Sequence, residues 1–392
     1  MSQQVKILGC GAAGNKACIQ LLKDQVTEIG NVMLLNSTMK DIPDEYRNIA
    51  IEFGNVRGAG KERDLAKKMI FDSLKNKEVD IDNFISPMDK IAVIVTSSEG
   101  GTGSGSSIIL AQYLRKVLKM NVHLFVFTGF EDDARSLKNS VDWFSDLSED
   151  ITVEAISNKA FMNEAKTRAE AEQLANKEFS KRISILIGNY IIPSEDNMDD
   201  TDLYKVSTTP GYMTIEHANI DKLKSTDDFN HILEDMIDNS KSLDTEIGSK
   251  RIGIIMNVSK KNRAYIDESF SIIKEKYGQP YELFTHFQET GEDEFVHFII
   301  AGRKLPIDSI KKAYQKYEKQ MESIDFNHDS FFGSKEKFNT DAPDGMDMNL
   351  SFGNDPKEYE KDAKDFFASF STAEKDTKKS ESHFTNITKN EL

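Results

Sequence analysis

The chain has 392 residues with 66 acidic and 50 basic side chains, a formal net charge of −16, and two cysteines. This charge argues against direct, non-specific binding to nucleic acid or to an anionic membrane, because both repel an acidic surface. Two cysteines are too few for a disulfide framework and favour a reducing cytoplasm, and no apolar run approaches the ~18 residues of a membrane helix. We therefore expect a cytoplasmic protein with room for two domains.

The first 162 residues alternate short apolar runs with helical patterns, such as IAVIV before SIILAQYLRKVL. Near-continuous apolar strands that alternate with helices indicate a parallel sheet covered on both faces. We therefore expect the α/β class, with a doubly wound parallel sheet as the first domain, over residues 1–162.

The rest of the chain divides into four parts. A polar stretch rich in helix formers predicts one long central helix over residues 163–191. An acidic loop and a pattern of strand, helix, strand, strand then predict a smaller α+β C-terminal domain over residues 192–304. A charged closing helix is expected over residues 305–326. Residues 327–392 lack apolar periodicity and carry 14 acidic side chains against 9 lysines, a net charge of −5, which predicts a disordered acidic tail.

A first glycine loop lies between the first strand and the first helix. Gly9, Gly11 and Gly14 match the spacing G-x-G-x-x-G, which is typical of dinucleotide-binding folds. Such a fold places an acidic residue near the end of its second strand, where this chain has Asn36. A monomeric, nucleotide-dependent oxidoreductase of the Rossmann type therefore stays open as an alternative.

A second glycine loop, SSEGGTGSGSS over Ser97–Ser107, holds four glycines and six hydroxyl residues between a strand and a helix. A helix N-terminus there would offer unpaired N–H groups and the positive end of the helix dipole, which suit a phosphate. Neither loop ends in G-K-[ST], which excludes a Walker loop. Two glycine loops at one edge of a sheet can hold a single polyphosphate from two sides.

The segment GGTGSG, Gly100–Gly105, resembles the signature of the tubulin/FtsZ superfamily of self-assembling GTPases. Other segments follow in the order of that superfamily, from residue 3 to about 325. Gly9–Asn15 resembles the first phosphate loop, which makes residues 1–162 a nucleotide-binding domain. Asn55–Asp64 resembles the loop that senses the γ-phosphate.

Further segments resemble the parts that hold the nucleoside. Phe130–Arg135 is similar to the ribose-binding segment, with Asp132 in place of a glycine, while Ala155–Asn158 and Ala175–Phe179 resemble the segments whose asparagines contact guanine. The resemblance implies GTP or GDP and Mg²⁺ as ligands, and no protein side chain as metal ligand. The nucleotide-binding residues that it implies are Gly11, Ala12, Ala13, Asn15, Asn36, Gly58, Ala59, Gly60, Lys61, Gly100, Gly101, Thr102, Gly103, Ser104, Gly105, Glu131, Arg135, Asn158 and Asn176.

The acidic loop after the predicted central helix carries Asn197, Asp199 and Asp202, which match the superfamily's N-x-D-x-x-D. Taken alone, this segment is as well explained by a solvated acidic linker. The resemblance implies that the three residues are catalytic, because they enter the nucleotide site of the next subunit and polarise the attacking water. It therefore implies a head-to-tail homopolymer that hydrolyses GTP at the interface between subunits.

Two departures limit the resemblance. Glu172 stands one helical turn before Asn176, where the superfamily has an aromatic residue for the base, so a preference for guanine rests on the resemblance alone. The chain end also differs from the terminal peptide of FtsZ. With this tail, the NKEF segment of the predicted central helix and the long closing helix, the chain most resembles the divergent plasmid and phage members, TubZ and PhuZ. That implies plasmid or phage DNA segregation or positioning, with a DNA-bound adaptor or phage cargo held by the tail. An FtsZ-like cell-division protein is the alternative within the superfamily.

Overall fold

The computed structural model describes residues 5–54, 58–194, 198–221, 223, 225–259, 262–290, 293–323 and 361–369. The strands in these residues are β1 Val5–Cys10, β2 Val32–Asn36, β3 Ala50–Glu52, β4 Ile91–Ser97, β5 Asn121–Thr128, β6 Thr152–Ser157, β7 Gly211–Asn219, β8 Arg251–Asn257, β9 Glu282–Gln288 and β10 Phe295–Arg303. The helices are α1 Gly11–Lys23, α2 Arg63–Lys75, α3 Ile81–Phe84, α4 Thr102–Lys116, α5 Ala134–Ser145, α6 Arg168–Leu186, α7 Asp200–Ser207, α8 Thr226–Asp238, α9 Tyr265–Tyr277 and α10 Ile307–Ser323.

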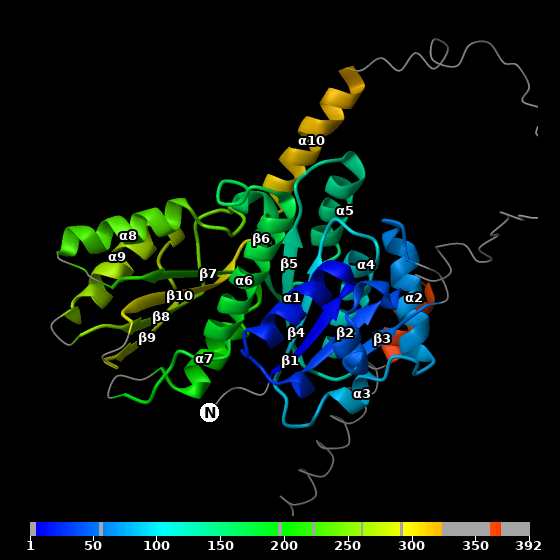
Figure 1. The fold of residues 1–392 in the computed structure, drawn as a ribbon, viewed down its shortest axis with the longest axis horizontal. Coiled ribbons are helices and arrows are strands. Elements are labelled where there is room, and N and C mark those ends of the chain that lie inside the picture. Colours follow the sequence, from blue (N-terminus) through cyan, green and yellow to red (C-terminus); the bar gives the residue numbers. More distant parts are fainter. Residues whose placement is uncertain are drawn as a thin grey trace, which may run out of the picture. The chain divides into compact units, whose positions relative to one another are not determined.

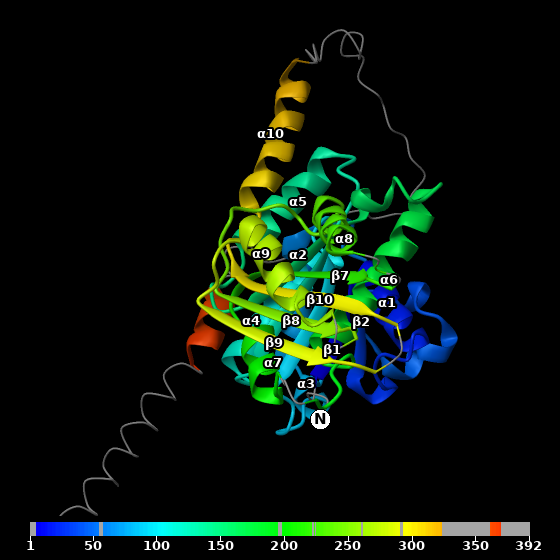
Figure 2. The same ribbon diagram turned by 90° about the vertical axis from the view of Figure 1, so that its left-hand side faces the viewer.

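The described strands form one sheet of ten, in the order β3-β2-β1-β4-β5-β6-β7-β10-β8-β9. Strands β1 to β7 are parallel to one another, whereas β10 runs antiparallel to both β7 and β8. Figure 2 shows β7, β10, β8 and β9 lying side by side in this order. The predicted fold class is confirmed, and the C-terminal strands join the same sheet through β7, which the sequence pattern did not reveal.

Helices cover the parallel strands on both faces (Figure 1). On one face α1 and α6 bury apolar side chains against the strands, and Phe179 of α6 lies edge-on to Phe125 of β5 with ring centroids 4.6 Å apart. On the other face α4 packs against β4 and β5, with α2 and α5 beside it. A second core under α8 and α9 covers β8 and β10. Among the described residues, apolar side chains are therefore buried on both faces of the parallel strands and, separately, under α8 and α9.

The central helix α6 is shorter than the predicted 163–191. It begins after Thr167, whose side chain accepts a hydrogen bond from the N–H of Glu170, so the chain turns into the helix there. It ends at Leu186, and Gly188 follows with φ of +82°, a left-handed conformation that glycine adopts at low cost. The caps, rather than the helix-forming composition, fix the length of α6.

The chain divides into two compact units, residues 1–311 and 312–392. Helix α10 spans Ile307–Ser323, close to the predicted closing helix over 305–326. In the range expected to be a disordered tail, residues 361–369 form a helix, and the other residues beyond 323 lie outside the described part of the chain. Ala363 and Phe367, one turn apart, are its buried side chains.

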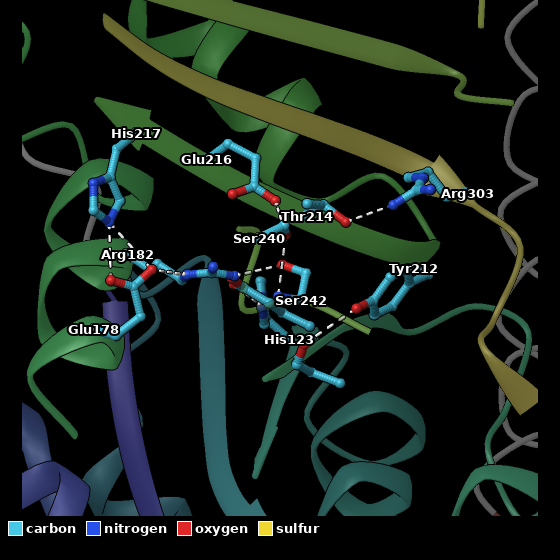
Figure 3. A network of polar contacts seen from close by, with 12 residues as sticks. His123, Glu178, Arg182, Tyr212, Thr214, Glu216, His217, Ser240, Ser242 and Arg303 are labelled. Carbon is cyan, nitrogen blue, oxygen red and sulfur yellow. Dashed lines mark hydrogen bonds and ion pairs between the residues drawn. The ribbon is translucent and has the colours of Figure 1, made fainter. Parts of the chain in front are cut away.

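A polar network joins α6 to the neighbouring strands β6 and β7 (Figure 3). Arg182 of α6, 1% exposed, donates to Glu154 of β6 at 2.9 Å and to Glu178 at 2.6 Å. Nε2 of His217 on β7 lies 3.0 Å from Glu178. Removing one member of such a buried pair typically costs about 3–5 kcal/mol, because a charge is left unpaired. The network therefore fixes α6 against β6 and β7 together.

Glu216 of β7 belongs to the same network, where it accepts hydrogen bonds from the hydroxyl groups of Ser240 and, at 3.4 Å, Tyr277. Burial raises the pKa of Glu216 from 4.5 to about 7, against the opposing effect of Arg182. Between these two values the folded chain holds a proton that the unfolded chain has released. The stability that this group contributes is therefore lost as the pH rises through about 7.

The variant Glu216→Gln should remove this part of the pH dependence, because glutamine stays neutral and its oxygen can still accept from Ser240. We expect the melting temperature of the natural chain, followed by circular dichroism, to fall more between pH 5 and pH 8 than that of the variant. Identical pH profiles for the two proteins would contradict the assignment.

Candidate nucleotide-binding site

The carboxyl ends of the parallel strands all lie at one edge of the sheet, so the loops that follow β1, β2, β4, β5 and β6 meet there. The order of β3 to β6 is that of dinucleotide-binding folds, in which ligands bind at this edge. The predicted nucleotide-binding residues of the two glycine loops lie at this edge. So do Asn36 at the end of β2, Glu131 after β5, Arg135 at the start of α5 and Asn158 after β6. The topology therefore brings residues from five separate loops to one place.

Two helices begin at this edge with free backbone N–H groups. Within the described residues, neither α1, which starts at Gly11, nor α4, which starts at Thr102, has a side-chain cap. Helices α2 and α9 also lack such a cap, whereas α5, α6, α7 and α8 are capped by an Asp, Thr or Ser side chain. Uncapped N–H groups and the positive end of each helix dipole can bind an anion. Ala12 and Ala13 lie on the open face of the first turn of α1.

The two glycine loops touch each other. Gly11 has φ of +73°, and a Cβ atom on it would lie 2.8 Å from the backbone nitrogen of Gly103. A Cβ on Gly103 would lie 2.6 Å from the carbonyl oxygen of Cys10. The hydroxyl groups of Ser37 and Thr102 lie 2.8 Å apart and join the second strand's loop to α4. Any side chain at Gly11 or Gly103 would separate the loops, so glycine is required there.

Three asparagines of the site have a buried amide atom that lacks a hydrogen-bond partner among the described residues. These atoms are Oδ1 of Asn15, Nδ2 of Asn36 and Oδ1 of Asn158. The second amide atom of two of them forms a hydrogen bond. Nδ2 of Asn15 donates to the carbonyl of Leu35, and Oδ1 of Asn36 accepts from the N–H of Ser37. Buried polar groups are usually paired, so three unpaired amides around one edge are what a site for a polar ligand would present.

The loop before α2 lies directly against the second glycine loop. A Cβ on Gly101 would lie 2.8 Å from both Cα and N of Lys61. Asn139 of α5 donates to the carbonyl oxygens of Lys61, Glu99 and Gly100, at 3.1, 3.0 and 3.3 Å. Sequence analysis missed Asn139, whose one signal is a polar residue on the buried face of an amphipathic helix. It ties the two loops together.

Gly58, Ala59 and Gly60 are the predicted residues that directly precede Lys61, and Ala59 is buried. The hydroxyl of Ser104 donates to the carbonyl of Gly100 inside the turn. A Cβ on Gly105 would lie 2.3 Å from the carbonyl oxygen of Arg63, so α2 and α4 meet closely there.

The predicted ribose-binding residues are held by ion pairs. Glu131, with φ of +61°, accepts from Lys159 at 2.6 Å, and Arg135 donates to Glu62 at 2.7 Å. Lys61 donates to Asp133 at 2.8 Å, and this lysine lowers the pKa of the Asp133 carboxyl to about 2. The loop after β5 is therefore joined to the loop before α2 by charge.

Glu99 is a second residue that sequence analysis missed. Burial raises the pKa of its carboxyl, and the N–H groups of Gly129 and Glu131 donate to it. A Cβ on Gly129 would overlap the Glu99 carboxyl group, so a larger residue there would displace this side chain. An acidic residue inside a glycine-rich phosphate loop was the available signal. Its side chain connects that loop to the loop after β5.

Asn176 lies on α6 and is half-buried. Helix α6 packs against α1, and Glu172, one turn before Asn176, lies 3.6 Å from Lys16 of α1. The position that holds an aromatic residue in the superfamily thus carries a carboxylate facing a lysine. A base beside Asn176 would meet an ion pair rather than an aromatic ring.

The predicted catalytic residues lie elsewhere. Asn197 falls outside the described residues. The side chain of Asp199 caps α7 by accepting from the N–H of Asp202 at 2.8 Å, and Asp202 lies 3.5 Å from Lys205. Asp199, Thr201 and Leu203 line a cavity of about 560 Å³ at the C-terminal end of α6.

Helix α7 lies at the amino ends of the parallel strands. The hydroxyl of Tyr204 accepts from the side chain of Asn121, the first residue of β5, and Thr209 accepts from Thr152, the first residue of β6. The glycine loop follows the other end of β4, which at ~3.3 Å per residue is about 20 Å away. The structure therefore places Asp199 and Asp202 and the predicted nucleotide-binding residues of the glycine loops at opposite edges of the sheet.

In the part of the chain that the structure describes, no three His, Cys, Asp or Glu side chains are grouped to hold a metal ion. Mg²⁺ commonly keeps several waters and binds through nucleotide phosphates, so an uncapped phosphate cradle suits it without a protein cage.

Among the described helices, none is long and apolar enough to cross a membrane.

Comparison with known proteins gives matches to structures alone. No family model and no curated protein matches the chain. TubZ of Clostridium botulinum phage c-st matches at 17% identity with a TM-score of 0.62, over 82% of this chain and 100% of that chain. CetZ2 from Haloferax volcanii, in a GTPγS-bound protofilament, matches at 14% identity with a TM-score of 0.66, over 82% and 99%. A dimer of FtsZ from M. jannaschii matches at 16% identity with a TM-score of 0.59, over 77% and 88%.

The chain therefore has the fold of the tubulin/FtsZ superfamily, as the resemblance of its glycine loops predicted.

Gly103→Ala should destabilise the chain by about 1–3 kcal/mol, because its Cβ would overlap the backbone of Cys10, and should weaken nucleotide binding with it. Gly100→Ala is the matched control, since a Cβ there would meet no described atom within 4 Å. Urea unfolding midpoints measure the difference. Equal midpoints for the two variants would contradict the contact between the loops.

Proposed function

We propose that the chain is a GTPase that assembles head to tail into filaments and hydrolyses GTP where one subunit meets the next. One observation carries this proposal: the phosphate cradle and the acidic loop lie at opposite edges of one sheet, about 20 Å apart along β4. Within one chain Asp202 cannot reach a nucleotide on α4. Stacking of identical subunits along the strand direction brings the acidic edge of one onto the nucleotide edge of the next.

Such a contact uses two different surfaces of the same protein. A heterologous contact generates a ring if its rotation closes and an open filament if it does not. The CetZ2 neighbour was solved as a GTPγS-bound protofilament, which supports filaments for this fold. We propose a cytoplasmic homopolymer for this chain on the same geometry.

The cradle's own part in hydrolysis is to hold and neutralise the phosphates. The N-termini of α1 and α4 supply N–H groups, and Mg²⁺ bound to the phosphates supplies further positive charge. The acidic loop of the next subunit then positions the attacking water. Asp202 is the carboxylate available for this, because Asp199 already caps α7. Phosphoryl transfer needs little more than such positioning and charge neutralisation.

The ligand is proposed to be GTP or GDP. The unpaired amides of Asn15, Asn36 and Asn158 support a ligand rich in polar atoms, and Asn158 follows β6, where the resemblance places a guanine contact. Asn176 lies beside the ion pair of Glu172 and Lys16, so hydrogen bonds rather than aromatic stacking would hold the base. The remaining predicted residues line the phosphate and ribose parts.

A Rossmann-type oxidoreductase is the alternative from another class. Its ribose site needs a carboxylate at the end of β2, where Asn36 is buried and accepts from the N–H of Ser37. This observation favours the GTPase. Light scattering with GTP and fluorescence titration with NADH distinguish the two functions.

Within the superfamily we propose a role in plasmid or phage DNA segregation or positioning, through a DNA-bound adaptor or phage cargo attached to the tail. The net charge of −16 supports an adaptor rather than direct DNA binding. An FtsZ-like role in cell division is the alternative, and attachment of a DNA-bound adaptor to the tail would decide against it.

Asp202→Ala should bind GTP and assemble, yet hydrolyse GTP about 10²–10⁴-fold more slowly, because a group that acts only in the transition state is lost. Filaments that persist after GTP addition, seen by light scattering together with phosphate release, are the expected result. The matched control is Asp200→Asn on the same turn of α7, which should keep most of the activity.

The variant Asp199→Asn removes the charge of this side chain but keeps the cap of α7, since asparagine caps a helix as well as aspartate. A normal rate of GTP hydrolysis by Asp202→Ala would contradict the proposed role of the acidic loop.

A further inference from the structure

The backbone of Lys61 is fixed beside the start of α4. Its carbonyl oxygen accepts from Asn139 at 3.1 Å, and its Cα and N lie against Gly101, the residue that precedes α4. The backbone of Lys61 has φ of +65°, a conformation that residues other than glycine rarely adopt. The surrounding contacts must maintain it. The backbone therefore holds this lysine at the phosphate cradle, and only its flexible side chain is free to choose a partner.

In the structure that partner is Asp133. The ammonium group of Lys61 lies 2.8 Å from Asp133 Oδ2 and 2.9 Å from the hydroxyl of Ser136. Both charged side chains are close to half-exposed, at 49% and 41%. Ion pairs that are open to water are weak, so a stronger anion can take the lysine from Asp133.

Asp133 has a second task that does not depend on its charge. Its Oδ1 accepts from the N–H of Ser136 at 2.9 Å and caps α5. Asparagine can do the same, since the two residues are equally good helix caps. The charge of Asp133 can thus be removed while α5 keeps its start.

We propose that Asp133 is a positioning residue that competes with the terminal phosphate of GTP for Lys61, so that the lysine distinguishes a nucleoside triphosphate from a diphosphate. This rests on the proposed function. The diphosphate lacks the third phosphate, so Lys61 stays on Asp133 and the loop before α2 stays joined to the loop after β5. The triphosphate offers a more highly charged partner at the start of α4, and the pair opens.

The test measures the dissociation constants of GDP and of a non-hydrolysable GTP analogue, by fluorescence titration of the full chain below its assembly concentration. Asp133→Asn should tighten binding of the analogue about two- to fivefold and leave GDP unchanged, since the weak competing ion pair is gone. Lys61→Ala should weaken the analogue but not GDP. In the double variant, Asp133→Asn should bring no further gain.

The matched control is Asp132→Asn, because the neighbouring carboxylate pairs with Arg168 instead. It should leave the ratio of the two dissociation constants unchanged. An Asp133→Asn protein with the natural ratio, or a gain that persists without Lys61, would overturn the proposal. A natural chain that binds neither guanine nucleotide would instead contradict the proposed function itself. Circular dichroism of each variant checks that α5 is intact.

Discussion

The direction of the strands is the constraint on which the rest of the structure depends. Because β1, β2, β4, β5 and β6 are parallel, every loop after a strand reaches the same edge of the sheet. Helix α6 then runs back and delivers the acidic loop to the other edge. There Tyr204 of α7 contacts the first residue of β5, and Thr209, just after α7, contacts the first residue of β6. One chain cannot close this distance, so on the proposed function a second copy would complete the site. Assembly would then follow from the strand topology.

The same helix gives the two edges a mechanical connection. Its first residue, Arg168, pairs with Asp132 in the loop after β5, and its last turn leads to the cavity beside α7. Between these ends Arg182 anchors it to β6, while Glu178 contacts His217 of β7 (Figure 3). A shift of α6 would therefore move both edges, and it would have to rearrange a buried charge network.

Sequence patterns found the parts of the site that depend on backbone geometry. Glycine is needed where loops touch, as at Gly11 and Gly103, and such needs leave a readable signature. Strand β7 was missed because polar side chains of the network, the buried Glu216 and the half-buried His217, interrupt its apolar pattern. Burial of polar groups depends on partners from distant segments, which no local pattern records.

The contacts that organise the site were also beyond local patterns. Lys61 and Asp133 are far apart in the chain, and Asn139 and Glu99 gain their meaning only where separate loops meet. Asp199 matched a catalytic pattern, yet it also caps α7, a role that only the start of the helix reveals. The motif therefore located these residues in the sequence, and the structure shows which contacts each of them makes.

The central claim, that each site is completed by a neighbour, is tested most directly by mixing two inactive variants. Gly100→Asp places a carboxylate where no described atom lies within 4 Å of its Cβ, so the chain should fold but repel the phosphates. Asp202→Ala binds nucleotide but lacks the carboxylate for the next subunit. In an equal mixture about one interface in four joins a sound cradle to a sound acidic loop, and GTP hydrolysis should return in that proportion. A mixture as inactive as its components would contradict the account.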